Sequence, residues 1–201
     1  MKLTSIPSDG KKHTCCLQCR RETLRERPPA TYTCTTCGFV SRRALIFDPA
    51  IKSWLGDDGE YWHQNAAVVV RDAKGRFLFL ERATYPSGLT IPIGHVDRGE
   101  KPPRAGRREL YEETNLQLPL SSFKRIVLEN ILGDPCRRGS DAHRWNVFAA
   151  PLAPGATVKV NHKESVRAEW LTLDEALQSP LVPVLRSVIN RHAAAILRGQ
   201  P

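Results

Sequence analysis

Apolar residues beyond position 60 gather into short runs that are typical of β-strands. AAVVVRD (66–72) has the composition of a buried strand, and RFLFLER (76–82) would run back beside it after a short turn. Further strands are predicted at 123–132, 144–152 and 165–173. Residues 85–94 contain two prolines and two glycines, so they predict a loop with at most a short strand.

Three segments have the pattern of helices. Pro102 and Pro103 suit the first turn of a helix, where missing N–H groups cost nothing, and this helix would run to about Thr114. LDEAL (173–177) begins a short helix, and residues 182–199 form an amphipathic pattern that would end at Gly199. Strands interleaved with helices predict an α+β fold in which helices cover a sheet.

Composition is that of a folded protein, with 201 residues of which 41% are hydrophobic. No apolar run approaches the ~18–20 residues that a membrane span needs, and the first residues lack an apolar signal core. We therefore expect a cytoplasmic protein with no membrane partner. Thiols stay reduced in the cytosol, so the six cysteines are expected to be metal ligands or free thiols.

Four cysteines form two CxxC pairs, Cys16 with Cys19 and Cys34 with Cys37. Each pair can direct two sulfurs at one point, and two pairs make the closed tetrahedral site of structural Zn2+. The segment resembles a zinc ribbon, whose folding energy would come from the metal. A redox dithiol is the alternative function, and Cys15 or His13 are alternative ligands. Cys136 stands alone and is expected to be a free thiol.

The sequence predicts three regions: a zinc ribbon at 1–47, a linker at 48–60 that is rich in Pro, Gly and Asp, and a larger domain at 61–201. Residues 1–45 carry nine Lys and Arg against three Asp and Glu, whereas the remainder carries 21 against 18. A basic small module favours an anionic partner such as RNA. A solvated basic surface without a partner is the simpler alternative.

The segment GHVDRGEKPPRAGRRELYEETNL (94–116) carries the strongest motif of the chain. It resembles the Nudix box, G-x5-E-x7-R-E-U-x-E-E-x-G-U with U apolar, and the resemblance extends over about residues 60–200. The resemblance implies a Nudix α/β/α sandwich behind the zinc ribbon. Asn115 replaces the last glycine of the pattern, and Asn is the residue next best suited to a left-handed helix end.

The helix with this motif would crowd three carboxylates into about one turn. Glu109, Glu112 and Glu113 stand at i, i+3 and i+4, where like charges repel. Two unit charges about 4 Å apart interact by ~4 kcal/mol at an effective dielectric of about 20. A bound divalent cation reverses the sign of that energy, and hard oxygen ligands favour Mg2+ or Mn2+. A solvated acidic helix face is the alternative.

The Nudix resemblance also implies roles at matching positions. Glu109, Glu112 and Glu113 would bind Mg2+, with the carbonyl of Gly94 near the substrate and metal. Arg108 would orient the glutamates and Glu100 would pair with it, although a purely structural Arg108–Glu112 salt bridge is the alternative.

Two positions outside the box are further candidates. Glu164 would be the general base or another metal ligand, or else a surface glutamate. Arg82, at the end of a predicted strand, would contact phosphate. The aromatic residues that could stack on a substrate base are Trp145, Phe148, Trp62 and Tyr85, each with core or surface packing as the alternative, whereas Trp170 is expected in the core.

These features predict a Mg2+-dependent Nudix hydrolase that cleaves the diphosphate of a nucleoside diphosphate derivative, such as ADP-ribose, NAD(H) or a nucleotide sugar. A ribbon before a Nudix domain is similar to the NADH pyrophosphatase arrangement, but the SQPWPFPxS motif of that branch is absent after Leu116. One alternative is an RNA 5′-end pyrophosphohydrolase whose ribbon holds RNA, and another is a non-catalytic nucleotide sensor. A ribbon of this type could also support a homodimer.

Overall fold

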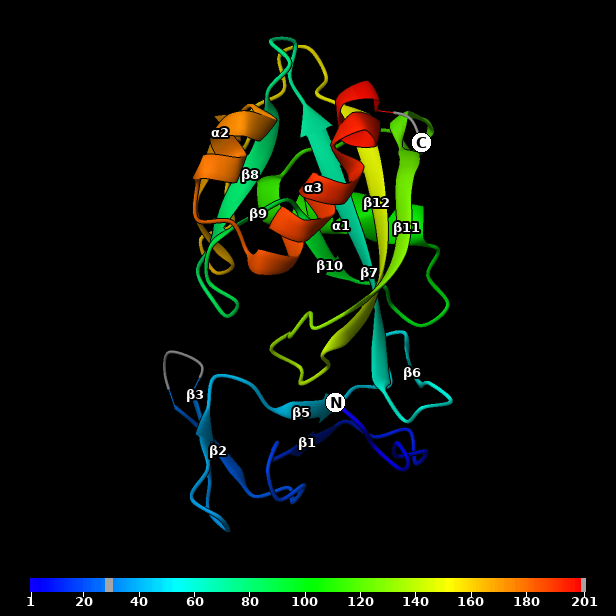
Figure 1. Cartoon of the computed structure of the whole chain (residues 1–201), viewed down its shortest axis with the longest axis vertical. Helices are drawn as coiled ribbons and strands as arrows, with labels where there is room; N and C mark the ends of the chain where they lie inside the picture. Colours follow the sequence, from blue (N-terminus) through cyan, green and yellow to red (C-terminus); the bar gives the residue numbers. More distant parts are fainter. Residues whose placement is uncertain (28–30, 200–201) are drawn as a thin grey trace.

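The structure, a computed structural model, describes residues 1–27 and 31–199, so residues 28–30 and 200–201 of the predicted regions lie outside it. A β-sheet lies between one helix on its first face and two helices on its second, with a small N-terminal module below (Figure 1). The helices are α1 (Pro102–Thr114), α2 (Leu173–Gln178) and α3 (Pro183–Arg198), with a short 3-10 turn at Leu120–Ser122. The predicted α/β/α sandwich is thus confirmed.

Within the described residues the main sheet has eight strands, in the order β11-β12-β7-β8-β13 with β6, β9 and β10 attached to its sides. The strands are β6 (Ser53–Leu55), β7 (Tyr61–Arg71), β8 (Phe77–Arg82), β9 (Leu89–Thr90), β10 (Ile93–His95), β11 (Lys124–Leu132), β12 (Ala142–Pro151) and β13 (Ser165–Leu171). Each strand expected beyond residue 60 is present. β7 begins five residues before the apolar run that predicted it, because its first residues pair with β6.

Strand β7 organises the sheet. One edge pairs in parallel with β12 along its length, from Trp62 to Arg71. The other edge pairs in antiparallel fashion first with β6, then with β10, and finally with β8 at Arg71. The short strand β10 therefore lies against the middle of β7, and the chain enters the acidic helix α1 directly after it.

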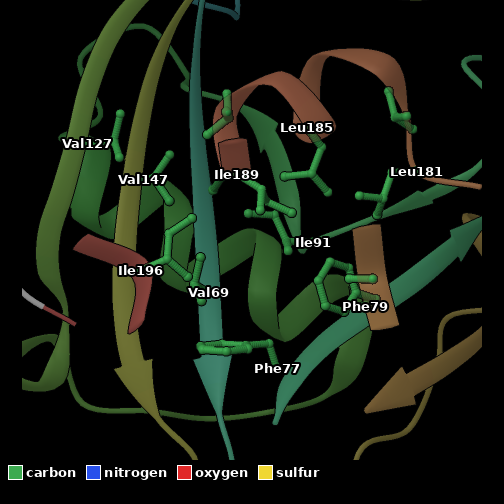
Figure 2. Packing of buried hydrophobic residues seen from close by; sticks show 14 of the residues in the cluster. Val69, Phe77, Phe79, Ile91, Val127, Val147, Leu181, Leu185, Ile189 and Ile196 are labelled. Carbon is green, nitrogen blue, oxygen red and sulfur yellow. The ribbon is translucent and has the colours of Figure 1, made fainter. Parts of the chain in front are cut away.

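Side chains of β7 alternate between two cores because successive residues of a strand point to opposite faces. Val69 packs with Phe77 and Phe79 against α3, which contributes Leu185 and Ile189 (Figure 2). This core explains the amphipathic pattern that predicted α3.

Val68 and Val70 face the opposite side, where they pack with Leu110 of α1. Gly106 of α1 brings the helix close to the sheet, since a Cβ there would lie 3.2 Å from Val68 Cγ2. The closest approach of α1 thus lies one turn before its glutamates.

Both ends of α1 lie where the sequence predicts them. Pro102 opens the helix without a side-chain cap. Asn115 closes it in the left-handed conformation with φ 58°, and its N–H donates to Tyr111 O at 2.7 Å. The departure from glycine at this position keeps the backbone geometry.

The N-terminal module contains two small sheets. β1 (His13–Cys15) pairs with β5 (Leu45–Phe47), and β3 (Thr31–Cys34) lies between β2 (Leu24–Arg27) and β4 (Val40–Ser41). The segment 48–60, expected to be a linker, includes strand β6 and the buried Ile51. The turn-forming residues of this segment gave no sign of strand β6, which forms by pairing with β7.

The loop between β11 and β12 bridges the module and the sandwich (Figure 1). Arg43 of the module donates to Cys136 O at 2.9 Å and to Ser140 O at 3.0 Å. The backbone N–H of Ile46 donates to Arg138 O at 3.1 Å. The N-terminal module is therefore attached to the larger domain through this loop as well as through the chain.

No helix among residues 1–27 and 31–199 is both long and apolar enough to cross a membrane.

The α3 core gives a stability prediction. Replacing Leu185, which is 1% exposed, with Ala leaves a cavity and should lower the free energy of unfolding by about 2–5 kcal/mol. Leu197 on the same helix is 49% exposed, so Leu197→Ala should change it by less than about 0.5 kcal/mol. Urea unfolding of both variants measures the difference. Equal losses would contradict the packing of α3.

Candidate active site and metal-binding clusters

Helix α1 places its three glutamates unequally. Glu109 and Glu113 are one turn apart on the buried face, with exposures of 9% and 5%. The Glu112 side chain is 47% exposed and stands at the rim. All three line one cleft of about 440 Å3, so the structure brings the predicted carboxylates to one site. Within that site Glu109 and Glu113 are the inner carboxylates, and Glu112 is the outer one.

Gly94 is required by the position of Glu109. A Cβ atom on residue 94 would overlap the Glu109 carboxyl group. The glycine of the motif therefore allows strand β10 to lie directly against an acidic side chain. Its carbonyl belongs to the same cleft wall as the glutamates.

Arg108 holds the carboxylates in place. Its guanidinium donates to Glu109 Oε1 at 2.7 Å, to Glu100 Oε2 at 2.9 Å and to Glu112 Oε2 at 3.3 Å. It also donates to the backbone oxygen of His95 at 3.0 Å. The contacts join the helix, the loop before it and β10, so Arg108 makes the expected pair with Glu100 as well as the alternative pair with Glu112.

Burial changes the charge of the inner glutamates. Loss of water raises the pKa of Glu109 to about 7, although Arg108 opposes the shift. Burial, followed by repulsion from Glu109, raises the pKa of Glu113 well above its ordinary value. Carboxylates that resist ionisation beside one another fit a divalent cation, which would favour their charged form.

Glu164 and Arg82 line the same cleft. The backbone oxygen of Glu164 accepts from Ala83 N at 2.8 Å, which fixes the residue beside the end of β8. Burial lowers the pKa of Arg82, while Glu113 and Glu164 oppose that shift. Arg82 Nε is buried and has no hydrogen-bond partner among the described residues. Such a donor fits an anionic ligand in the cleft.

The cleft also contains cations that the sequence analysis did not select. They are Arg137, Arg138 and Lys163. Arg137 and Arg138 lie in the loop between β11 and β12, which the sequence showed only as a polar segment. The adjacent arginines were the one sequence feature that could have indicated a role of this loop in the cleft. Together with Arg82 and Arg108 they add positive charge to the lining of the cleft.

Among the four aromatic candidates, Trp145 is the one that lines the cleft in the described part of the chain. Its indole N–H donates to Asp134 Oδ2 at 2.7 Å. Phe148 is buried beneath α1, and Trp62 stacks on Trp54 with ring centroids 6.0 Å apart. The guanidinium groups of Arg42 and Arg43, both in the ribbon, lie over Tyr85, each 5.9 Å from the centroid of the tyrosine ring. Trp170 packs against the core on the α1 side of the sheet, as expected.

The four ribbon cysteines form one cluster. Cys16 Sγ lies 3.7 Å from Cys37 Sγ, and Cys19 Sγ lies 3.6 Å from Cys34 Sγ. Sulfurs about 2.3 Å from one tetrahedral ion are separated by about 3.8 Å, so the arrangement fits Zn2+.

The alternative ribbon ligands lie elsewhere. Cys15 is buried against Leu45 and Tyr61. His13 pairs with Asp9 and Glu22. The described structure therefore favours the four cysteines of the two CxxC pairs.

The interpretation of Cys136 as an isolated thiol needs correction. It lies in a cluster with His63, His95 and His143, all with donor atoms within 4.8 Å of one another. These residues are far apart in the sequence, so no spacing pattern identified them. The contacts form because β7, β10 and β12 are neighbours in the sheet.

Comparison with known proteins identifies the family. The NUDIX domain family model matches residues 62–192. Because this match covers most of the chain, the chain belongs to the Nudix family and is a Nudix hydrolase, an enzyme class that acts on phosphorus anhydrides. No curated protein sequence matches the chain.

Solved structures agree with the fold. The MutT protein from Methanosarcina mazei Go1 has a TM-score of 0.55 and 21% identity, covering 66% of this chain and 94% of that one. A C. elegans Ap4A hydrolase in a binary complex has a TM-score of 0.54 and 25% identity, covering 68% and 98%. The NUDIX domain of Shewanella oneidensis NrtR, in complex with ADP ribose, has a TM-score of 0.55 and 16% identity, covering 66% and 87%.

The raised pKa of Glu109 gives a test of the site's electrostatics. Below pH 4.5 the carboxyl is protonated in both the folded and unfolded states, whereas above about pH 7 the folded protein must hold it charged. Without Mg2+ or Mn2+, Glu109→Gln should therefore be more stable than the wild type by about 1–3 kcal/mol at pH 8, with a smaller gain at pH 5. Urea unfolding at both pH values measures the change.

The control is Glu169→Gln on β13, whose partner is the exposed Arg167. It should show no such gain. A Glu109→Gln variant that is less stable than the wild type at pH 8 would contradict the conclusion that burial of the charged Glu109 carboxylate destabilises the folded protein.

Proposed function

We propose that the protein hydrolyses the diphosphate linkage of nucleoside diphosphate derivatives in a Mg2+- or Mn2+-dependent reaction. The observation that carries this proposal is the cleft itself. Two buried carboxylates and Arg82, whose buried Nε has no hydrogen-bond partner in the described structure, belong to the lining of one cleft. That pairing suits a metal ion on one side of a diphosphate and a cation on the other.

We assign the cation site to Glu109, Glu112, Glu113 and the carbonyl of Gly94. A cation held there supplies positive charge to the diphosphate oxygens and lowers the pKa of an attacking water. Arg108 orients the carboxylates through its hydrogen bonds, and Glu100 fixes Arg108 in turn. Arg108 and Glu100 are therefore positioning residues.

Glu164 and Arg82 complete the assignment. Glu164 lines the cleft within electrostatic reach of Glu109 and Glu113, which supports a role as the general base that accepts a proton from water. Arg82 donates to a phosphate oxygen. Arg137, Arg138 and Lys163 lie around the same cleft and stabilise the remaining phosphate charge.

ADP-ribose, NAD(H), dinucleoside polyphosphates and nucleotide sugars form the substrate panel. The similar structures include an Ap4A hydrolase and a NUDIX domain in complex with ADP ribose, which motivates an adenosine diphosphate unit as the common element. A cleft of about 440 Å3 has the size of a small-ligand site. NAD(H) stays in the panel although the motif of the NADH pyrophosphatase branch is absent.

The function is tested by Glu113→Gln on that panel with products identified by mass. We expect the variant to lose at least ~100-fold in kcat with its fold kept, because it removes a buried charge that binds the metal. Glu169→Gln is the control and should keep the wild-type rate. Full activity of Glu113→Gln, or hydrolysis of no panel member by the wild type, would refute the proposal.

A second candidate substrate is the 5′ end of RNA, held by the basic ribbon. Arg42 and Arg43 of the ribbon lie over Tyr85, beside the cleft residues Thr84 and Pro86. An RNA whose end enters the cleft would therefore pass the ribbon arginines. The four-cysteine cluster would hold Zn2+ as the structural ion of this module. The predicted homodimer stays a prediction.

RNA binding should depend on Arg42, because the Arg43 guanidinium is already held by the backbone oxygens of Cys136 and Ser140. A 5′-triphosphorylated RNA should bind the Arg42→Ala variant several-fold more weakly, and the salt dependence of log Kd should flatten by about one unit of slope. Lys74→Ala, in the turn after β7, is the control for charge alone. Fluorescence anisotropy from low to physiological salt measures both. Equal binding by all three proteins would exclude the ribbon as the RNA site.

The sensor alternative has less support. A nucleotide sensor does not need the acidic helix, whereas this chain retains every carboxylate of the motif. The same panel separates the two, because a sensor would bind its ligand without releasing products.

A further inference from the structure

A second cluster of metal-binding side chains lies at the active-site cleft, where His95, Cys136 and His143 are part of the lining. His63 comes from β7, His95 from the end of β10, and His143 from the start of β12. Cys136 comes from the loop between β11 and β12. One donor atom of each residue lies within 4.8 Å of all the others. None of the four takes part in the function proposed above.

Two separations within the cluster fit a tetrahedral ion. His63 Nδ1 lies 3.1 Å from His95 Nε2, and Cys136 Sγ lies 3.7 Å from His63 Nδ1. Ligand bonds of about 2.0–2.1 Å to nitrogen and 2.3 Å to sulfur place two nitrogens about 3.3 Å apart and a nitrogen and a sulfur about 3.6 Å apart. The cluster therefore has the dimensions of a metal site before any side chain moves.

Protein groups alone leave this cluster unsatisfied. His63 and His143 are 0% and 1% exposed. Among the described residues, Nε2 of His63 and Nε2 of His143 have no hydrogen-bond partner, and Nδ1 of His143 makes no hydrogen bond of good geometry. A buried polar atom without a hydrogen-bond partner destabilises the folded state by about 1–3 kcal/mol. The imidazoles have too few donors and acceptors to satisfy one another's ring nitrogens. A cation among them would give His143 the partner that it lacks.

Asp134 is placed to orient His143 toward such an ion. Asp134 Oδ2 lies 3.0 Å from His143 Nδ1, which is an ion-pair distance, although the geometry is not that of a well-formed hydrogen bond. Because Asp134 is on the Nδ1 side of the ring, Nε2 of His143 remains free to bind a metal. The same oxygen accepts from Trp145 Nε1 at 2.7 Å, which fixes the carboxylate. A carboxylate behind a metal-binding histidine is the usual device that sets ring orientation and tautomer.

We propose that His63, His95, Cys136 and His143 form a second tetrahedral site for Zn2+ or a similar borderline divalent ion, separate from both the ribbon and the Mg2+ site. Three imidazoles and one thiolate are ligands that zinc prefers and magnesium does not. Four protein ligands close the coordination sphere, so the site is structural rather than catalytic.

Such an ion would hold together residues that line the cleft. It joins β7 and β12 to His95, which follows Gly94 and whose backbone oxygen accepts from Arg108. It also holds the loop that carries Arg137 and Arg138 into the cleft. Because that loop contacts the N-terminal module through Arg43, the site also supports the attachment of the ribbon.

Metal analysis of the full chain, expressed with zinc and purified by gel filtration, tests the inference. We expect about two zinc ions per chain in the wild type and about one in Cys136→Ser/His143→Asn. Cys34→Ser/Cys37→Ser, in the ribbon, should also keep about one. Cys15→Ala removes a buried thiol outside both clusters and should keep about two.

X-ray absorption at the zinc edge makes the test independent of variant folding. Wild-type zinc should show on average roughly 2.5 sulfur and 1.5 nitrogen ligands, and zinc in the ribbon variant roughly one sulfur and three nitrogens. Either spectrum supports the site. Wild-type zinc bound by sulfur alone, or a Cys136→Ser/His143→Asn variant that keeps the full zinc content, would overturn the proposal without bearing on the hydrolase activity.

Discussion

The architecture of the cleft depends on the burial of two carboxylates on a helix face that otherwise packs against the sheet. Glu109 and Glu113 alternate with Ala105, Gly106 and Leu110 on the buried side of α1. Apolar residues at these positions would bind the helix more firmly to the sheet, because burial of charge opposes folding. The protein accepts that cost beside a cleft that is also lined by cationic side chains, which is the arrangement expected of a site that binds a metal and phosphates.

Neighbouring elements hold these carboxylates in place. Gly106 brings α1 close to Val68, and Gly94 allows β10 to lie against the Glu109 side chain. Arg108 then joins the helix to Glu100 and to the backbone of His95. Because β10 is itself paired with the centre of β7, the residues beside the buried glutamates are supported by the most extensively bonded strand of the sheet. Rigid support of this kind is what a preorganised site requires.

Much of this arrangement could be predicted from local sequence. Prolines at the start of α1 and Asn115 at its end fixed its boundaries, and the spacing of Gly94, Glu100 and Arg108 identified the family before any geometry was known. The CxxC pairs likewise identified the ribbon cluster. These signals are local because one turn or one helix determines them. The difference between the inner glutamates and the rim residue Glu112 was not predictable, since it depends on how α1 sits on the sheet.

Features that arise between distant segments were missed for the same reason. His63 and His143 are eighty residues apart and meet because β7 and β12 pair in parallel, with the two histidines opposite each other in register. β6 forms only against β7, and the loop arginines reach the cleft only because the β11–β12 connection folds back over it. Strand pairing order is a long-range property that spacing along one chain does not contain.

We propose that Glu109 and Glu113 hold a divalent cation against the carbonyl of Gly94. Crystals of the wild-type protein soaked in Mn2+, with diffraction recorded near the manganese absorption edge, test this directly. We expect an anomalous peak between these groups in the cleft. A cleft without manganese, or manganese bound only at the exposed Glu112, would contradict it.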